Sequence, residues 1–278
     1  MTMQLVVQGA ALGRSDIDAL SAFTTISSWT QVSASAVRAP VGERLPALDA
    51  LCRERRLDLA YVPDDRRLAD VGLVAFDMDS TLITIECIDE IADLQGIKPQ
   101  VATITARAMR GEIDFAESLR RRVALLEGLD DSALARVYDE RLRLSPGAEQ
   151  MLAAFRAAGA TTLLVSGGFT FFTDRLKERL LLDHTASNVL ASAGGRLTGK
   201  IVGDIVDANA KAEAVRRLRE RPQMRGKLSV AIGDGANDLP MLAEADISVA
   251  YHAKPVVREK TTHCIDYCGL DAVVNLFC

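Results

Sequence analysis

The 278-residue sequence is poor in aromatic residues and histidine, and it has no long hydrophobic run. Aromatic side chains make up 5% of the chain, with a single tryptophan, and there are three histidines. No apolar run approaches the roughly 20 residues that a membrane-spanning helix needs. The N-terminal residues also lack the basic region and long apolar core of a secretory signal. We therefore expect a cytoplasmic protein that makes no contact with a membrane.

Cysteine is also scarce, and positive charge is not in excess. The five cysteines are Cys52, Cys87, Cys264, Cys268 and Cys278. An odd number in a chain this long favours free thiols in a reducing compartment over a disulfide framework. Cys264 and Cys268 with His263 fall one ligand short of a structural zinc site. The formal net charge is −5 and no long basic tract is present, which argues against nucleic-acid binding.

The first 70 residues have the pattern of a small separate α/β unit. Strands are expected at 3–7, 29–34 and 57–62, and helices at 15–23 and 45–55. This order is β-α-β-α-β, and a polar linker follows it. No cluster of acids, bases or glycines lies within the unit. It could serve regulation, or it could extend the main sheet or form a homodimer surface, and these interpretations have equal support.

One stretch is more informative, residues 71–82, which reads VGLVAFDMDSTL. Its first six residues are apolar or glycine and rich in β-branched side chains, which predicts a strand buried on both faces of a parallel sheet. Asp77 and Asp79 follow at the carboxyl end of that strand, where ligands bind in open α/β sheets. Two buried carboxylates are costly unless they hold a cation or take part in a reaction. We therefore expect a functional site here.

The next region, 87–142, has a helical pattern throughout. Four helices are expected, and Asp114 with Glu117 resembles a capping box at the start of one of them. A crossover between two parallel strands needs only one helix. We therefore interpret residues 87–142 as a helical cap, inserted into the α/β unit and seated over the strand ends.

Strands and helices alternate again from residue 143. Buried strands are expected at 161–165 and 228–232, a hairpin at 188–202, and further strands at 247–250 and 264–266. The alternation predicts an α/β fold with a doubly wound, Rossmann-like parallel sheet. Residues 71–86 and 143–278 would together form this α/β unit, which we expect to be the catalytic one.

Acidic side chains gather at the ends of two of these strands. Asp77 and Asp79 follow the first, and Asp234 and Asp238 follow the strand at 228–232, so four carboxylates are expected near one point. Carboxylates this close raise one another's pKa unless a cation neutralises them. Oxygen ligands favour Mg²⁺, which also accepts a phosphate oxygen. A calcium loop fits less well because its distal Glu is missing, and a sugar-transferase DxD motif would explain only the first pair.

Anion donors are expected at the same edge. Ser166 is followed by two glycines and a helix, where backbone N–H groups can approach an anion, and Lys211 opens a later helix. Each is a weak signal alone, but with four acids they predict a site for Mg²⁺ and phosphate. There Asp77 would attack phosphorus and form an aspartyl-phosphate. Asp79 would protonate the leaving oxygen and then activate water, while Lys211 and Ser166 stabilise the transferring group.

These motifs resemble the four motifs of the haloacid-dehalogenase-type phosphatases. They are DMDST at 77–81, SGG at 166–168, Lys211 and GDGAND at 233–238. The similarity extends to the phosphoserine phosphatase branch of that family and covers residues 71–278. The resemblance implies that Asp77, Asp234 and the backbone carbonyl of Asp79 ligate Mg²⁺, and that Asp238 orients this metal set.

The resemblance also implies a set of substrate-binding residues. These are Glu86, Met109, Phe115, Arg122, Ser166, Gly167, Lys211 and Asn237. A lid carboxylate such as Glu86 can pair with an ammonium group, and Arg122 can hold a carboxylate with two hydrogen bonds. Met109 and Phe115 would line the pocket by resemblance, although such helix positions usually belong to the core.

The activity implied by the resemblance is Mg²⁺-dependent hydrolysis of O-phospho-L-serine to L-serine and phosphate, the last step of L-serine biosynthesis. One alternative is a phosphatase or phosphotransferase for another small phosphomonoester. A second, from a different class, is an amino-acid-sensing binding protein that uses residues 1–70. That segment is shorter and less regular than the ACT-type domains of some relatives. Apart from a homodimer, the only partner expected is a small-molecule substrate.

Overall fold

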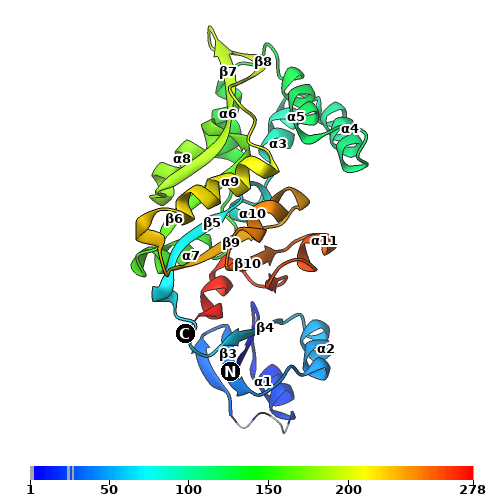
Figure 1. Cartoon of the computed structure of the whole chain (residues 1–278). Helices are drawn as coiled ribbons and strands as arrows, with labels where there is room; N and C mark the ends of the chain where they lie inside the picture. Colours follow the sequence, from blue (N-terminus) through cyan, green and yellow to red (C-terminus); the bar gives the residue numbers. More distant parts are fainter. Residues whose placement is uncertain (1–2, 24–25, 27, 278) are drawn as a thin grey trace.

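The computed structural model describes residues 3–23, 26 and 28–277. Within this part of the chain there are two β-sheets, one of four strands and one of seven. Figure 1 shows the four-stranded sheet at one end of the molecule and the seven-stranded sheet above it, with a group of helices at the far end.

The seven-stranded sheet forms the centre of the larger unit. Its strands, in sheet order, are β11 (His263–Ile265), β10 (Ile247–Tyr251), β9 (Leu228–Gly233), β5 (Val71–Phe76), β6 (Thr161–Phe169), β7 (His184–Ala193) and β8 (Arg196–Val202). All neighbours pair in parallel except β7 and β8, which form the expected hairpin. The prediction of an α/β fold with a parallel sheet is therefore confirmed. Because β9, β5 and β6 are neighbours, their carboxyl ends meet at one edge.

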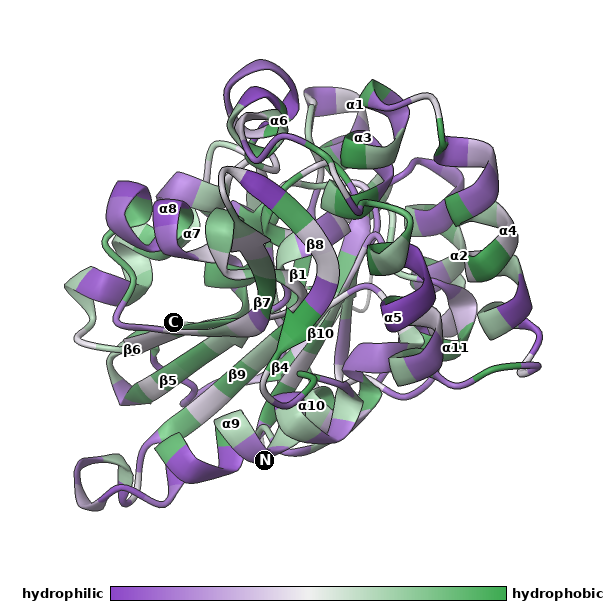
Figure 2. Cartoon of the chain, turned by 90° about the horizontal axis from the view of Figure 1, so that it is seen from above, coloured by the Kyte–Doolittle hydropathy of each residue, from purple (hydrophilic) through white to green (hydrophobic). Residues whose placement is uncertain are grey.

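Helices cover both faces of this sheet. They are α7 (Ala148–Ala157), α8 (Thr170–Leu180), α9 (Ala208–Arg219), α10 (Leu239–Ala243) and α11 (Pro255–Arg258). The side chains of β5 alternate between two cores: Phe76 packs in the core that includes α7 and α8, and Leu73 in the core that includes α9 and α10. Figure 2 shows hydrophobic residues in strands such as β10, and mixed or hydrophilic colouring on outer helices such as α9 and α5. Burial on both faces explains the unbroken apolar run of β5.

The lid segment, residues 87–142, is inserted between β5 and β6. Its helices are α3 (Cys87–Leu94), α4 (Lys98–Met109), α5 (Phe115–Ala124) and α6 (Ser132–Arg136), followed by a π-helical turn at Val137–Arg141. Asp114 caps α5 by accepting the N–H of Glu117 at 2.7 Å. The N–H of Gly128 donates to the Leu197 carbonyl, and the N–H of Leu197 donates to the Leu129 carbonyl, both at 2.8 Å. The lid segment is thus joined to the β7–β8 hairpin by backbone hydrogen bonds.

The N-terminal unit contains one strand more than the sequence pattern indicated. Its elements are β1 (Met3–Gln8), α1 (Arg14–Ser21), β2 (Thr30–Ser33), β3 (Ala36–Val41), α2 (Pro46–Glu54) and β4 (Asp58–Pro63), and the antiparallel sheet has the order β2-β3-β1-β4. The prediction of β-α-β-α-β was therefore wrong, because β3 was missed. Pro40 and Arg38 interrupt its apolar pattern. Pro40 lies beyond Arg38, the last residue paired with β2, so β3 is an edge strand there and tolerates proline.

Buried polar groups join the N-terminal unit to the seven-stranded unit. The carboxylate of Asp58 accepts the backbone N–H groups of three successive residues, Asp266, Tyr267 and Cys268, at 2.7 to 3.2 Å. The guanidinium of Arg38 donates to the carbonyls of Asn275 and Phe277. Side chains of β1 and β4 also belong to the same hydrophobic core as β5. The contact between the two units is thus both apolar and hydrogen-bonded.

Two further predictions concern the membrane and the cysteines. None of the helices in the described residues combines the length and hydropathy that a membrane crossing requires. Cys52, Cys87, Cys264 and Cys268 are free thiols, whereas Cys278 lies outside the described residues.

Candidate active site

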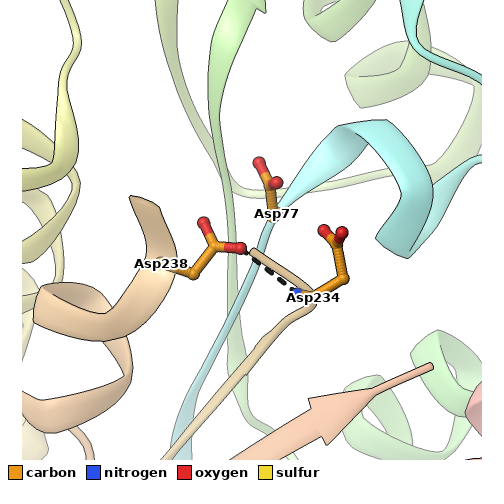
Figure 3. A group of neighbouring side chains, drawn as sticks. All are labelled: Asp77, Asp234 and Asp238. Atoms are coloured by element: carbon orange, nitrogen blue, oxygen red, sulfur yellow. Dashed lines mark hydrogen bonds between the residues drawn. The ribbon is translucent and has the colours of Figure 1, made fainter. Parts of the chain in front are cut away.

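Three carboxylates meet where β5 and β9 end. Asp77 directly follows β5, and Asp234 and Asp238 follow β9. Each of the three offers one oxygen atom within 4.8 Å of the others. In Figure 3, Asp238 lies on the left and Asp234 on the right, with Asp77 above and between them, and Asp238 accepts a hydrogen bond from the backbone of Asp234. The predicted convergence of these acids is therefore present, and such a group can hold a cation.

Lys211, near the start of α9, places its ammonium group between Asp77 and Asp238. Its Nζ is 2.6 Å from Oδ1 of Asp77 and 2.7 Å from Oδ1 of Asp238. The helix is fixed at its start by the side chain of Asp207, which accepts the N–H of Ala210. Burial by itself would lower the pKa of Lys211, but Asp77 and Asp238 outweigh it and raise that pKa. Lys211 is therefore charged at neutral pH.

One lysine does not balance the negative charge of the site. Burial raises the pKa of Asp77 well above its usual range, and the Asp238 carboxylate raises it further, against the opposing effect of Lys211. Burial, followed by Asp238, raises the pKa of Asp234 to about 6. Both shifts arise because burial disfavours the ionised carboxylate, and because the neighbouring Asp238 adds negative charge. The excess negative charge and the carboxylate oxygens of Asp77 and Asp234 fit a divalent metal ion.

Both carboxylate oxygens of Asp238 already accept hydrogen bonds. Its Oδ1 accepts from Lys211 and from the side-chain amide of Asn237. Its Oδ2 accepts the N–H groups of Asp234 and Gly235, at 3.2 and 3.0 Å. With 0% exposure, Asp238 fixes the loop after β9 and the position of the Lys211 ammonium.

Asp79 lies beside the three-acid group without belonging to it. Its Oδ1 accepts the N–H of Cys87 at 3.1 Å, at the first residue of α3. Burial, followed by the charge of Glu86, raises the pKa of Asp79 to about 7. A carboxyl group with a pKa near neutrality can both donate and accept a proton.

The segment Ser166-Gly167-Gly168 passes close to Asp79. The hydroxyl of Ser166 accepts the N–H of Gly168 at 2.8 Å. A Cβ atom at Gly168 would lie 2.8 Å from Cε of Met78 and 3.1 Å from Oδ2 of Asp79, so only glycine lets the backbone approach this closely. The serine and glycines thus line the same end of the sheet as the acids.

Residues of the lid segment also lie close to this site. The Cζ atom of Phe115 is 2.9 Å from where a Cβ of Gly167 would stand. Burial lowers the pKa of Arg122, while the nearby carboxylates of Asp89 and Glu86 raise it. Nε of Arg122 is buried, and in the described part of the chain it has no hydrogen-bond partner. An unpartnered guanidinium nitrogen beside the acids is suited to a ligand carboxylate.

Glu86 is held by the loop that carries Asp77 and Asp79. The hydroxyl of Ser80 donates to Oε1 of Glu86 at 2.8 Å, and Ser80 has a left-handed backbone with φ of 57°. Met109 differs from the other candidates, because it is 71% exposed at the last residue of α4. Its place in the pocket stays a prediction.

Sequence reasoning missed three contributors. The Thr81 hydroxyl donates to Oδ1 of Asp234 at 3.2 Å, the N–H of Cys87 holds Asp79, and the side chain of Asn188 binds the Gly167 carbonyl. The role of Thr81 could have been predicted, because it lies four residues after Asp77 in the same loop. The N–H of Cys87 and the side chain of Asn188 correspond to no recognisable pattern in the sequence.

The chain is similar in sequence and structure to known proteins. Residues 74–243 match the model of the haloacid dehalogenase-like hydrolase family. The chain is 52% identical over 217 residues to a phosphoserine phosphatase from Polaromonas sp., covering 76% of this chain and 92% of that protein. It is similar to the unliganded crystal structure of a probable phosphoserine phosphatase from Vibrio cholerae, with a TM-score of 0.85, 39% identity, and 98% and 85% of the two chains covered. It is also similar to a phosphoserine phosphatase structure described as a phospho-aspartyl intermediate analogue, with a TM-score of 0.68, 36% identity, and 75% and 99% covered.

Proposed function

This chain belongs to the haloacid dehalogenase-like hydrolases and, within them, to the phosphoserine phosphatases, and on that premise we propose that it hydrolyses O-phospho-L-serine to L-serine and phosphate. The observation that carries the proposal is the position of Glu86 and Arg122. The Ser80 hydroxyl holds Glu86 beside Asp79, whose pKa the Glu86 carboxylate raises. The buried Nε of Arg122 near both acids has no hydrogen-bond partner among the described residues, so a cation site and an anion site stand next to the acids. A substrate with ammonium, carboxylate and phosphate groups fits this arrangement.

In the first step, Asp77 attacks phosphorus. Lys211 holds Oδ1 of Asp77, which leaves Oδ2 as the attacking oxygen. The bond from phosphorus to the serine oxygen breaks, and neutral Asp79 gives its proton to that oxygen. The products are L-serine and an aspartyl-phosphate on Asp77.

In the second step, water replaces Asp77. Asp79, now ionised, takes a proton from water as the water oxygen attacks phosphorus. The bond between phosphorus and Asp77 breaks, which releases phosphate and restores the Asp77 carboxylate. A pKa near 7 suits Asp79 to both steps.

We assign the phosphate site to Ser166, Gly167 and Lys211, with Asn237 nearby. The charge of Lys211 and the N–H groups around Gly167 stabilise the negative charge on the phosphoryl oxygens. Lys211 is already fixed by two hydrogen bonds, so it needs no reorganisation when the substrate binds.

We further propose that the metal ion is Mg²⁺, held by Asp77, Asp234 and the backbone carbonyl of Asp79. When bound, it would neutralise charge on a phosphoryl oxygen. Asp238 would orient this set, since both its oxygens already accept hydrogen bonds.

The serine end is assigned to the lid segment and to Glu86, the residue directly before it. Glu86, held by Ser80, pairs with the ammonium group, and Arg122 binds the carboxylate through its unpartnered nitrogen. Phe115 packs over Gly167 and excludes water from the phosphate, and Met109 completes the pocket only if α4 moves inward.

The wider assignments follow from the same premise. We propose a catalytic unit of residues 71–86 and 143–278, a lid at 87–142 and a separate N-terminal unit at 1–70. The reaction would serve as the last step of L-serine biosynthesis in the cytoplasm, where the free thiols are stable. A homodimer through the N-terminal unit is part of this proposal.

The test is phosphate release from O-phospho-L-serine and from p-nitrophenyl phosphate in the presence of Mg²⁺. Asp77→Asn should abolish release from both esters while circular dichroism shows an unchanged fold. Arg122→Ala should raise KM for phosphoserine about 10- to 100-fold, since a hydrogen bond to a charged group contributes about 1.5 to 3 kcal/mol. It should leave the aryl ester unchanged, because that substrate has no carboxylate.

Arg121→Ala is the matched control, since Arg121 is the neighbour on α5 and pairs with Glu117 on the outer face. It should change neither substrate. Full activity of Asp77→Asn would refute the mechanism. Equal losses for both esters in Arg122→Ala would refute the substrate and favour another small phosphomonoester, as a phosphatase or a phosphotransferase.

A further inference from the structure

The backbone of β6 leaves its regular pairing with β7 at the Ser166–Gly168 segment. Val165 pairs with Ala186 and Phe169 pairs with Asn188, so the chain advances four residues along β6 but two along β7. The two extra residues form a bulge, and bulges beside active sites redirect the groups they carry. This bulge carries Ser166 and Gly167, to which the proposed function assigns phosphate binding.

A bulge removes backbone groups from the ladder, and a buried carbonyl without a partner is unfavourable. The side chain of Asn188 supplies the missing partner. Its Nδ2 donates to the carbonyl of Gly167 at 2.8 Å. The side chain is 1% exposed, so water does not compete for this contact.

The other end of the same amide reaches a second catalytic segment. Oδ1 of Asn188 accepts the N–H of Val206 at 2.8 Å. Val206 immediately precedes Asp207, the residue that caps α9, and α9 carries Lys211. One end of the amide faces a carbonyl and the other faces an N–H, so its orientation is fixed by its partners. The single side chain therefore links the Gly167 loop to the start of the Lys211 helix.

We propose that Asn188 is a positioning residue for phosphate binding, which sets the Gly167 loop and the Lys211 helix at a fixed separation. It touches neither the phosphate nor the attacking oxygen. It acts through the two segments that do, so its loss affects the phosphate end of any substrate. This inference rests on the proposed role of Gly167 and Lys211, but not on which alcohol the phosphate is attached to.

Two variants separate the two ends of the amide. Asn188→Asp keeps the acceptor for Val206 but places a carboxylate oxygen against the Gly167 carbonyl, so it removes the donor. Asn188→Ala removes both contacts. Both should lower kcat/KM about 10- to 100-fold, because a small displacement of a group that positions the substrate has effects of this size. The factor should be the same for O-phospho-L-serine and p-nitrophenyl phosphate, and the inhibition constant for inorganic phosphate should rise in parallel.

Thr162→Val is the control for a purely structural effect. Thr162 lies at the opposite end of β6, is 2% exposed, and exchanges hydrogen bonds with Asp183. Its replacement should lower the thermal midpoint without changing phosphate inhibition or kcat/KM.

Several outcomes would overturn the inference. If the Asn188 variants lost stability as Thr162→Val does, with unchanged phosphate inhibition, the amide would be structural only, and the same holds if neither variant folded. A loss confined to phosphoserine would place the effect at the serine end. If the unmodified protein cleaved only the aryl ester, the proposed substrate would fail, while Asn188 could still be tested with that ester.

Discussion

Nζ of Lys211 lies 2.6 Å from Oδ1 of Asp77, and the two side chains are 2% and 7% exposed. Asp238 completes this buried group from the other side of the ammonium. The ion pair is therefore flanked by carboxylates and largely removed from water. A buried pair of this kind contributes little by itself, but removing one partner leaves charge without compensation.

Lys211→Met should destabilise the metal-free protein by about 3 to 5 kcal/mol, because Asp77 and Asp238 lose the cation between them. Excess Mg²⁺ should restore part of this loss, since a bound cation replaces the missing charge. Urea unfolding with a chelator and with MgCl₂ measures both effects. Lys260→Met, an exposed lysine, is the control and should change little. Equal stabilities of the two variants would contradict the role given to the ion pair.

The acids should also make the stability of the metal-free protein depend on pH. The pKa of Asp79 is raised to about 7 and that of Asp234 to about 6, from an ordinary value of 3.8. Between these limits the folded state binds more protons than the unfolded state, so the free energy of unfolding falls as pH rises. In a chelator, stability should therefore decrease from pH 4 to pH 7, and Asp77, whose pKa is also raised, adds to the same slope.

Magnesium and one variant test the origin of that slope. A cation held by Asp234 lowers its pKa, so the decrease should be smaller with MgCl₂. Asp79→Asn removes one of these groups and should make the decrease smaller near pH 7. An increase of stability over the same window without metal would show that other groups dominate.

The catalytic sheet could be predicted because its signals are local. β5 is a continuous apolar run that ends at Asp77, and β6 and β9 likewise carry apolar residues before Ser166 and Asp234. Parallel strands bring their carboxyl ends to one edge, so the meeting of Asp77 with Asp234 followed from topology alone. Glu86 and Arg122 came from resemblance, because nothing in helix periodicity shows which side chains face a distant loop.

The contacts that sequence could not supply are those between segments far apart in the chain. Asn188 bonds to Gly167 because of a bulge, and strand periodicity does not reveal where pairing slips by two residues. Strand β3 was missed because Pro40 breaks its pattern, although that part of the strand is at an edge. Asp58 resembles an ordinary polar residue at the start of a strand until its partners, more than 200 residues away, are known.

Asp58 leads to the last prediction. It is 4% exposed, and its two oxygens accept three consecutive N–H groups that follow β11. Asp58→Ala leaves these buried donors without partners and should reduce the free energy of unfolding by about 3 kcal/mol. Two strands separate β11 from β5, so kcat for the phosphatase reaction should stay unchanged. Urea unfolding and steady-state kinetics on the same preparation measure both quantities.

Asp65→Ala provides the comparison, because Asp65 is exposed in the segment after β4. Asp58→Asn should fall between the two, since it keeps one acceptor oxygen. If Asp58→Ala were as stable as Asp65→Ala, the N-terminal unit would be held by its apolar contacts alone. If kcat fell with stability, the unit would act on the reaction through β11 rather than serve as a fixed support, which would give the first 70 residues the regulatory role that their sequence leaves open.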